Sequence, residues 1–77
     1  MNTFWFCGEG RKIAINAINE NRAWMILGRL YKPSNPEVVK FSYKLIKNID
    51  SKQGEGRLAD IPNREKEDDI DFRSVNL

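Results

Sequence analysis

The sequence predicts a small α+β domain, in which a short N-terminal strand or extended arm and a two-helix hairpin are followed by a flexible acidic C-terminal tail. Of the residues in the set AVILMFWYC, 24 fall in residues 1–50 and only 7 in residues 51–77. Residues 1–53 hold nine basic and four acidic side chains, whereas residues 54–77 hold four basic and seven acidic ones. These two observations predict a folded domain at 1–50 and a polar tail at 51–77.

The first expected element is a strand or extended arm at residues 3–7. This aromatic and apolar run ends at Gly8-Glu9-Gly10, a composition typical of a short strand followed by a turn. Between residues 11 and 31, apolar side chains then recur at steps of three and four, which indicates a helix. A β-hairpin of residues 12–18 and 22–30 is the alternative, since Ile13, Ile15 and Ala17 also alternate. In that case the fold is a β-hairpin or a three-stranded sheet followed by one helix.

A second helix is expected to begin near Pro36. Ser34 or Asn35 can cap it, Pro36 suits the first helical position, and Glu37 complements the helix dipole. The apolar face of this helix is expected to contain Val38, Phe41, Leu45 and Ile49. Two helices and one short segment make a thin core, which favours self-association or docking on a partner.

The composition argues against catalysis and against a bound metal or cofactor. The chain has no His and one cysteine, so it contains neither the usual acid–base residue nor a Cys/His zinc set. Cys7 lies in an aromatic run and is interpreted as a small buried hydrophobe. The acidic run at residues 65–71 lacks the glycine-centred spacing of a calcium loop, and Gly8-Glu9-Gly10 lacks the spacing of a phosphate loop. We therefore expect no enzyme, no cofactor and no metal site.

The chain is expected to be cytoplasmic and to have no membrane partner. Its longest apolar run, residues 23–27, is far shorter than a membrane span. The N-terminus lacks the basic start and long apolar stretch of a secretory signal. A single cysteine also fits a reducing compartment.

Lys40, Lys44 and Lys47 follow one another at steps of four and three. On a helix they form a basic stripe that could bind a nucleic-acid backbone or an acidic protein. A solvated outer face, kept basic for solubility, is the alternative interpretation. Nucleic-acid binding through this helix face is the second function that the sequence suggests.

Trp5 is the expected partner-binding anchor in the N-terminal run. If Phe4-Trp5-Phe6 is a strand, both of its faces are aromatic, and Trp5 points away from its two neighbours. A small core has little room for both faces, so Trp5 is expected to be exposed. Tryptophan is also enriched at binding hot spots.

The tail contributes a second set of expected partner-binding residues, in which apolar side chains are spaced among acids: Asp68, Asp69, Ile70, Asp71 and Phe72. Such segments can fold onto a partner, where charge steers the encounter and the apolar residues anchor it. The same segment could occupy a basic groove meant for nucleic acid, or could serve solubility alone.

These observations favour a non-enzymatic small regulator or inhibitor that docks on a larger protein or protein complex. Self-association as a homodimer is a further expectation, because the predicted core is thin. Small chains without catalytic residues are often regulators, including those carried by phages and other mobile elements. No individual residue of the chain points to a phage or mobile-element origin, which is expected only by analogy with such chains.

Overall fold

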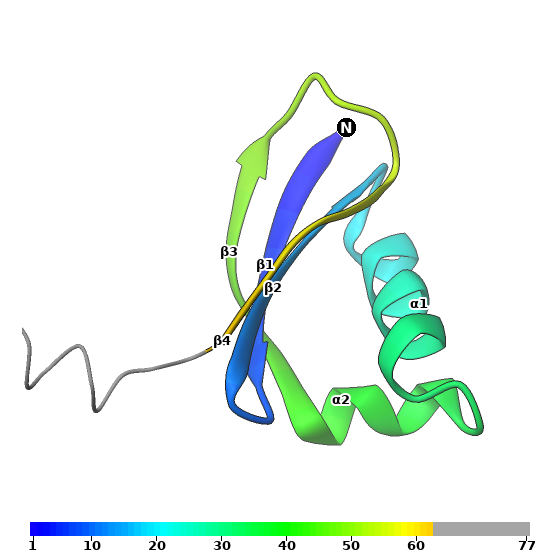
Figure 1. The fold of residues 1–77 in the computed structure, drawn as a ribbon. Helices are drawn as coiled ribbons and strands as arrows, with labels where there is room; N and C mark the ends of the chain where they lie inside the picture. The colour runs from blue at the N-terminus through cyan, green and yellow to red at the C-terminus, as the bar shows by residue number, and fades with distance from the viewer. Residues whose placement is uncertain (63–77) are drawn as a thin grey trace, which may run out of the picture.

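The computed structural model describes residues 1–62 and contains one four-stranded antiparallel sheet (Figure 1). The strands lie in the order β3-β1-β2-β4, so the N-terminal hairpin is central and the last two strands are the edges. Helix α1 lies against one face of the sheet, and two short helical turns connect it to β3 (Figure 1). The elements are β1 (Asn2–Gly8), β2 (Arg11–Ala17), α1 (Glu20–Tyr31), the 3-10 turn η1 (Pro36–Val38), α2 (Val39–Ser42), β3 (Tyr43–Asp50) and β4 (Gly56–Pro62).

The central hairpin turns at Glu9 and Gly10. Both residues have positive φ, 49° and 75°, which is the backbone of the tight hairpin turn that matches the twist of the two strands. Gly10 adopts this conformation without steric cost. Glu9 forms an ion pair with Lys32 at 2.5 Å, which ties the turn to the end of α1.

The predicted two-helix hairpin is wrong, and its first helix is a strand followed by a shorter helix. Residues 11–17 form β2, because the alternation of Ile13, Ile15 and Ala17 places all three on the helix-covered face, where each is fully buried. The helix begins only at Glu20, where the Asn19 side chain accepts the backbone N–H of Arg22 at 2.8 Å. The alternative with a strand at residues 22–30 is also wrong, since these residues lie in α1.

The second predicted helix ends after a few residues. Residues from Tyr43 onward form β3, which pairs with β1 along its whole length. The expected helix-face residue Phe41 is 91% exposed. Leu45 and Ile49 lie four residues apart, a spacing that fits one face of a helix and led to the helix prediction. The strand is favoured because it satisfies the backbone groups along the outer edge of β1.

The folded part of the chain continues beyond residue 50. Gly56–Pro62, which the sequence analysis assigns to the tail, forms β4 and pairs with β2. Residues 63–77, the rest of the expected acidic tail, lie outside the described residues. Within residues 1–62, no helix has the length and apolar character needed to cross a membrane.

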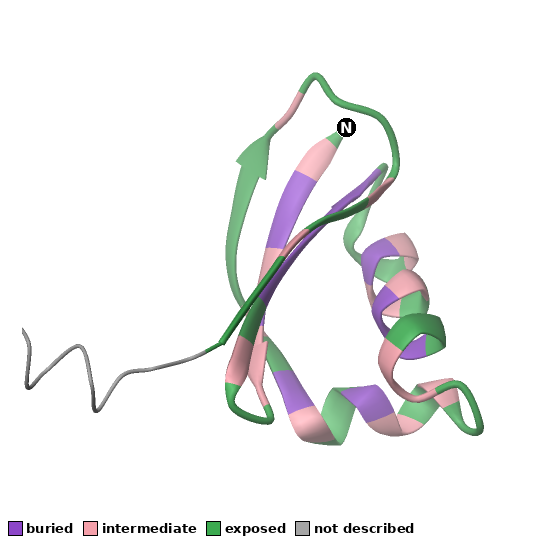
Figure 2. Cartoon of the chain, in the orientation of Figure 1, coloured by how far each residue is buried: buried purple, intermediate pink, exposed green. Residues whose placement is uncertain are grey.

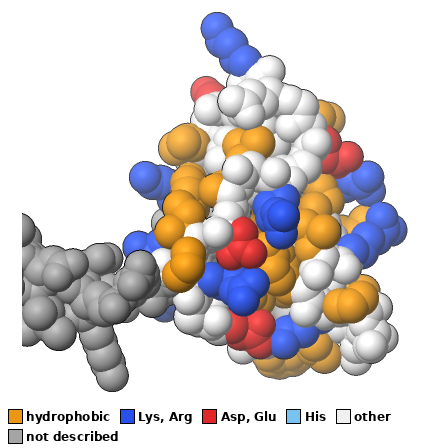
Figure 3. Space-filling view, viewed as in Figure 1, with side chains coloured by type: hydrophobic (Ala, Val, Ile, Leu, Met, Phe, Trp, Pro, Cys, Tyr) orange, Lys and Arg blue, Asp and Glu red, His pale blue; other side chains and the backbone are white. Residues whose placement is uncertain are grey.

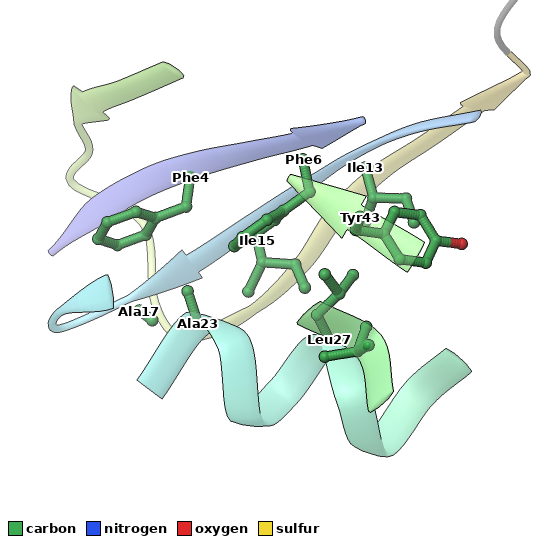
Figure 4. Close-up of a cluster of buried hydrophobic side chains, with 9 residues drawn as sticks. Phe4, Phe6, Ile13, Ile15, Ala17, Ala23, Leu27 and Tyr43 are labelled. Carbon is green, nitrogen blue, oxygen red and sulfur yellow. The ribbon is translucent and has the colours of Figure 1, made fainter. Parts of the chain in front are cut away.

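The core lies on one side of the sheet, between β1, β2 and α1 (Figure 4). Strand side chains point toward Ala23 and Leu27 on the helix, and Val39 and Tyr43 close the end near α2. β3 and β4 contribute little, since most of their residues are exposed (Figure 2). The buried hydrophobic cluster consists of Phe4, Phe6, Ile13, Ile15, Ala17, Ala23, Leu27, Val39 and Tyr43.

Candidate docking face on the uncovered side of the sheet

The sheet has a second face that no described helix covers. Paired residues of an antiparallel sheet share a face, and neighbours along a strand alternate between faces. Phe4 and Phe6 face α1, so Thr3, Trp5 and Cys7 point to the other side. From the strand pairing, we define the open face by Thr3, Trp5, Cys7, Lys12, Ala14, Asn16, Lys44, Lys47, Ile49, Gly56, Ala59 and Ile61.

Trp5 lies on the middle of this face and is partly exposed. Its register partners are Ala14 on β2 and Lys47 on β3. Ala14 has no bulk beyond a methyl group, so the indole can lie beside it over the sheet. Toward the two edges, Ile49 and Ile61 are 47% and 48% exposed. The open face therefore presents an aromatic ring between aliphatic side chains.

A bulge in β3 explains why Lys44 and Lys47 share this face. Residues three apart in a regular strand point to opposite sides. The register between β1 and β3 shifts between Trp5 and Phe6, so that Ile46 is an extra residue. Lys44 then lies opposite Cys7 and Lys47 opposite Trp5, both on the open face. Lys12, opposite Cys7 on β2, adds a third ammonium group.

The open face is basic as well as apolar. Its three charged residues are all lysines, and none of the strand residues that define it is acidic. Such a surface favours an acidic partner with apolar side chains, because the lysines attract charge while Trp5 offers area to bury.

One end of the open face is closed by the loop between β3 and β4. Asn16 is fully buried, accepts a hydrogen bond from the Thr3 hydroxyl and donates to Ser51 Oγ at 2.8 Å and to the Gly54 carbonyl at 3.1 Å. All buried side-chain nitrogen and oxygen atoms of residues 1–62 have hydrogen-bond partners. This end is therefore structural, and the accessible part of the face lies around Trp5 and the lysines.

A second charged cluster lies where β4 meets α1, on the covered side of the sheet. Asp60 accepts hydrogen bonds from Arg11 at 3.2 Å and from Tyr31 at 2.7 Å, and lies 3.8 Å from Arg57. Figure 3 shows basic and acidic side chains next to one another in this region. A cleft of about 280 Å³ here is lined by Gly10, Arg11, Asp60 and Pro62. Because its charges already pair with one another, the cluster is interpreted as a clamp that holds β4 to the helix.

The tyrosines at this end are held in their neutral form. Burial, together with the hydrogen bond to Asp60, raises the pKa of Tyr31. Burial and the neighbouring Glu9 carboxylate raise the pKa of Tyr43 to about 12. Neither phenol is prepared to act as a base near neutral pH, since a useful catalytic pKa lies near the working pH.

A shallow groove separates α1 from the turns that follow it. It measures about 310 Å³ and is lined by Asn21, Trp24, Met25, Pro36, Glu37, Val39 and Lys40. The Lys40 ammonium lies 5.9 Å from the centre of the Trp24 ring, and the indole N–H donates to Glu20 at 3.1 Å. Among residues 1–62 there is no cluster of His, Cys, Asp or Glu that could hold a metal ion.

The structure separates the residues that sequence analysis grouped as a basic stripe. The expected helix face is wrong: Lys40 lies on α2 beside Trp24, whereas Lys44 and Lys47 lie on β3 beside Trp5. Trp5 is directed away from the core, as predicted for an aromatic strand. Asp68, Asp69, Ile70, Asp71 and Phe72 lie outside the described residues.

Sequence analysis did not place Lys12, Ile49 or Ile61 on a shared binding surface, although they add charge and apolar area to the open face. Lys12 pairs opposite Cys7, and the alternation of β2 in the sequence could have identified it. Ile61 was assigned to the tail, and Ile49 to a helix core. Only the pairing of β3 and β4 with the central strands reveals these two, so no local signal could have found them.

No family model, characterised protein or solved structure matches the chain.

Proposed function

We propose that the protein is a non-enzymatic binding protein, a regulator or inhibitor that docks on a larger protein through its open face. The observation that carries the proposal is Trp5, a partly exposed indole in the middle of a sheet face that no described helix covers. Buried tryptophan at an interface contributes more binding energy than most residue types. A cytoplasmic setting is part of this proposal.

The partner surface is acidic and has an apolar depression. Three lysines without a carboxylate among them would repel a basic surface and attract an acidic one. The exposed side chains of Ile49 and Ile61 widen the apolar area around the ring. Burial of this apolar area is the main favourable contribution to the free energy of binding. The lysines orient the acidic partner and raise the rate of association.

The test uses immobilised full-length protein and nuclease-treated lysate. Trp5→Ala and the double variant Lys44→Gln/Lys47→Gln change the open face. Phe41→Ala and Lys40→Gln are matched controls, because they alter an exposed ring and a lysine outside it. Circular dichroism checks that each variant is folded.

The expected result is one protein recovered in stoichiometric amount by the wild type and both controls, but not by the open-face variants. With that protein purified, Trp5→Ala should raise Kd at least about tenfold, as for a hot-spot side chain. Equal affinity of Trp5→Ala and the wild type would contradict the proposal, as would a partner whose binding depends on Phe41.

Single-stranded nucleic acid is the second candidate, and it is favoured by Lys44 and Lys47 lying on the same face as Trp5. Indole rings stack on bases, and lysines contact phosphates. This candidate predicts recovery of nucleic acid without nuclease and no protein after it. The dependence of log K on log salt should then flatten by about 1.4 in Lys44→Gln/Lys47→Gln, at about 0.7 per phosphate contact of a single strand.

A further inference from the structure

We propose that the acidic segment 65–72 of the same chain binds the open face and competes there with the partner. The inference rests on the proposed function only in taking the open face as the binding surface. It adds an occupant and a means of regulation.

Charge complementarity is the first argument. Segment 65–72 reads Glu-Lys-Glu-Asp-Asp-Ile-Asp-Phe, with five acids and one lysine. The open face carries Lys12, Lys44 and Lys47 and no acidic strand residue. A second copy of the domain would instead bring three lysines against three lysines, and like charges across an interface are unfavourable.

The pattern of the segment is the second argument. Ile70 and Phe72 are two positions apart, so an extended backbone directs both to one side, with Asp69 and Asp71 on the other. A strand of this kind can direct its two apolar side chains toward the indole of Trp5. Its carboxylates then remain within reach of the long lysine side chains.

The point where the segment begins is the third argument. β4 ends at Pro62, and the preceding residue, Ile61, is already on the open face opposite Lys12. Trp5 lies two strands away, about 10 Å at the usual strand spacing. Residues 63–68 can span up to about 20 Å, so the segment reaches the indole with chain to spare.

Attachment to the same chain strengthens such a contact. A short linker holds the segment near the face at an effective concentration of the order of mM. A weak contact is then sufficient to occupy the face for part of the time. Partner binding has to displace the segment. The apparent affinity for the partner is therefore the affinity for the free face multiplied by the fraction of molecules whose open face is unoccupied.

The experiment is performed on the full-length, partner-free protein by ¹H–¹⁵N NMR. The chain has two tryptophans, so the two indole N–H signals report different surfaces: Trp5 on the open face and Trp24 on α1. The triple variant Asp68→Asn/Asp69→Asn/Asp71→Asn should move the Trp5 indole signal and leave that of Trp24 in place. High salt should produce the same shift in the wild type.

A spin label provides a second, independent measurement. In the Cys7→Ser background, a label at Ser74→Cys should broaden the Trp5 indole and the amides of Lys47 and Ile61 more than those of Ala23 and Leu27. Lys44→Gln/Lys47→Gln should remove the difference, and the matched control Lys40→Gln should retain it.

Two outcomes would overturn the inference. One is equal broadening of both sides of the sheet together with an unmoved Trp5 indole signal in the triple variant. The other is broadening that occurs only when labelled and ¹⁵N-labelled molecules are mixed, since the segment then binds a second copy. These measurements involve no partner, so a negative result would not contradict the proposed function. A negative capture experiment would likewise not contradict the binding of segment 65–72 to the open face.

Discussion

The two faces of the sheet are built from alternate residues of the same strands and have different environments. On the covered face, Phe4, Phe6, Ile13 and Ile15 are at most 2% exposed and pack against α1. On the open face, Trp5 and Cys7 are partly exposed and three lysines surround them. An antiparallel sheet with one wet face normally alternates apolar and polar residues. β1 departs from this alternation, since it places Trp5 and Cys7 on the open face, and this departure supports the proposal that the open face binds a partner.

The largest expected effect follows from shortening a side chain on the covered face. Phe6 is fully buried and its ring packs edge-on against Trp24, with 4.6 Å between centroids. Phe6→Ala should cost about 3–5 kcal/mol of the free energy of unfolding, enough to unfold much of so small a domain. Urea denaturation measured by circular dichroism tests this.

Trp5→Ala is the matched change on the other face. It should cost less than half as much stability as Phe6→Ala, since the indole already contacts solvent. If the two variants lose equal stability, Trp5 is a core residue and the distinction between the faces fails.

A smaller effect is expected at the closed end of the open face. Asn16 is buried and its amide joins Thr3 to the loop at Ser51 and Gly54. Asn16→Ala removes the acceptor of the buried Thr3 hydroxyl and both hydrogen bonds to the loop, which should cost about 1–3 kcal/mol. Denaturation gives the loss, and hydrogen exchange should show faster exchange in residues 51–55 than in the central hairpin. Protection of the loop equal to that in the wild type would mean that Asn16 does not hold it.

Sequence analysis succeeded where local signals decide the structure. Gly10 in a tight turn and the alternation of the first aromatic run are local, and both are found in the structure. β3 was taken for a helix because Val38, Phe41, Leu45 and Ile49 recur at helical steps of three and four, and only the pairing with β1 shows that residues 43–50 form a strand.

β4 could not be predicted from hydrophobicity at all. Its apolar residues Leu58 and Ile61 are 43% and 48% exposed, so its core burial is small. Backbone pairing with β2 and the clamp of Asp60 with Arg11 and Tyr31 hold it in place. Trp5 could be predicted as the outward residue of an aromatic strand. The shared face of Lys44 and Lys47 could not, because it depends on the bulge at Ile46.

Alkaline pH should weaken the covered face through Tyr43. Burial and the neighbouring Glu9 raise the pKa of this phenol to about 12, above its value near 10 in the unfolded chain. The folded state therefore holds the proton more tightly, and stability should fall as pH rises from 10 toward 12. Tyrosinate absorbance should show late ionisation, and Tyr43→Phe should reduce the alkaline loss. Ionisation of both tyrosines near pH 10 would contradict the buried position.

The smallest effect is expected at the turn of the hairpin that both faces share. The hydrogen bond from Lys32 lowers the pKa of Glu9 below its usual value, despite an opposing contribution from desolvation. The folded state therefore favours the carboxylate. The resulting stability should be present above the unfolded pKa, near 4.5, and should be lost as pH falls through the lower folded value.

Glu9→Gln should accordingly be slightly less stable than the wild type at pH 7, and the difference should shrink as the pH falls, because protonation leaves Glu9 uncharged, as Gln is at every pH. Arg22 and Glu55 form a comparable exposed pair, so Glu55→Gln is the control with the same pH dependence away from the hairpin. A difference between Glu9→Gln and the wild type that does not shrink as the pH falls would show that the side chain acts through packing. The ion pair between Glu9 and Lys32 would then make no contribution to the stability of the hairpin turn.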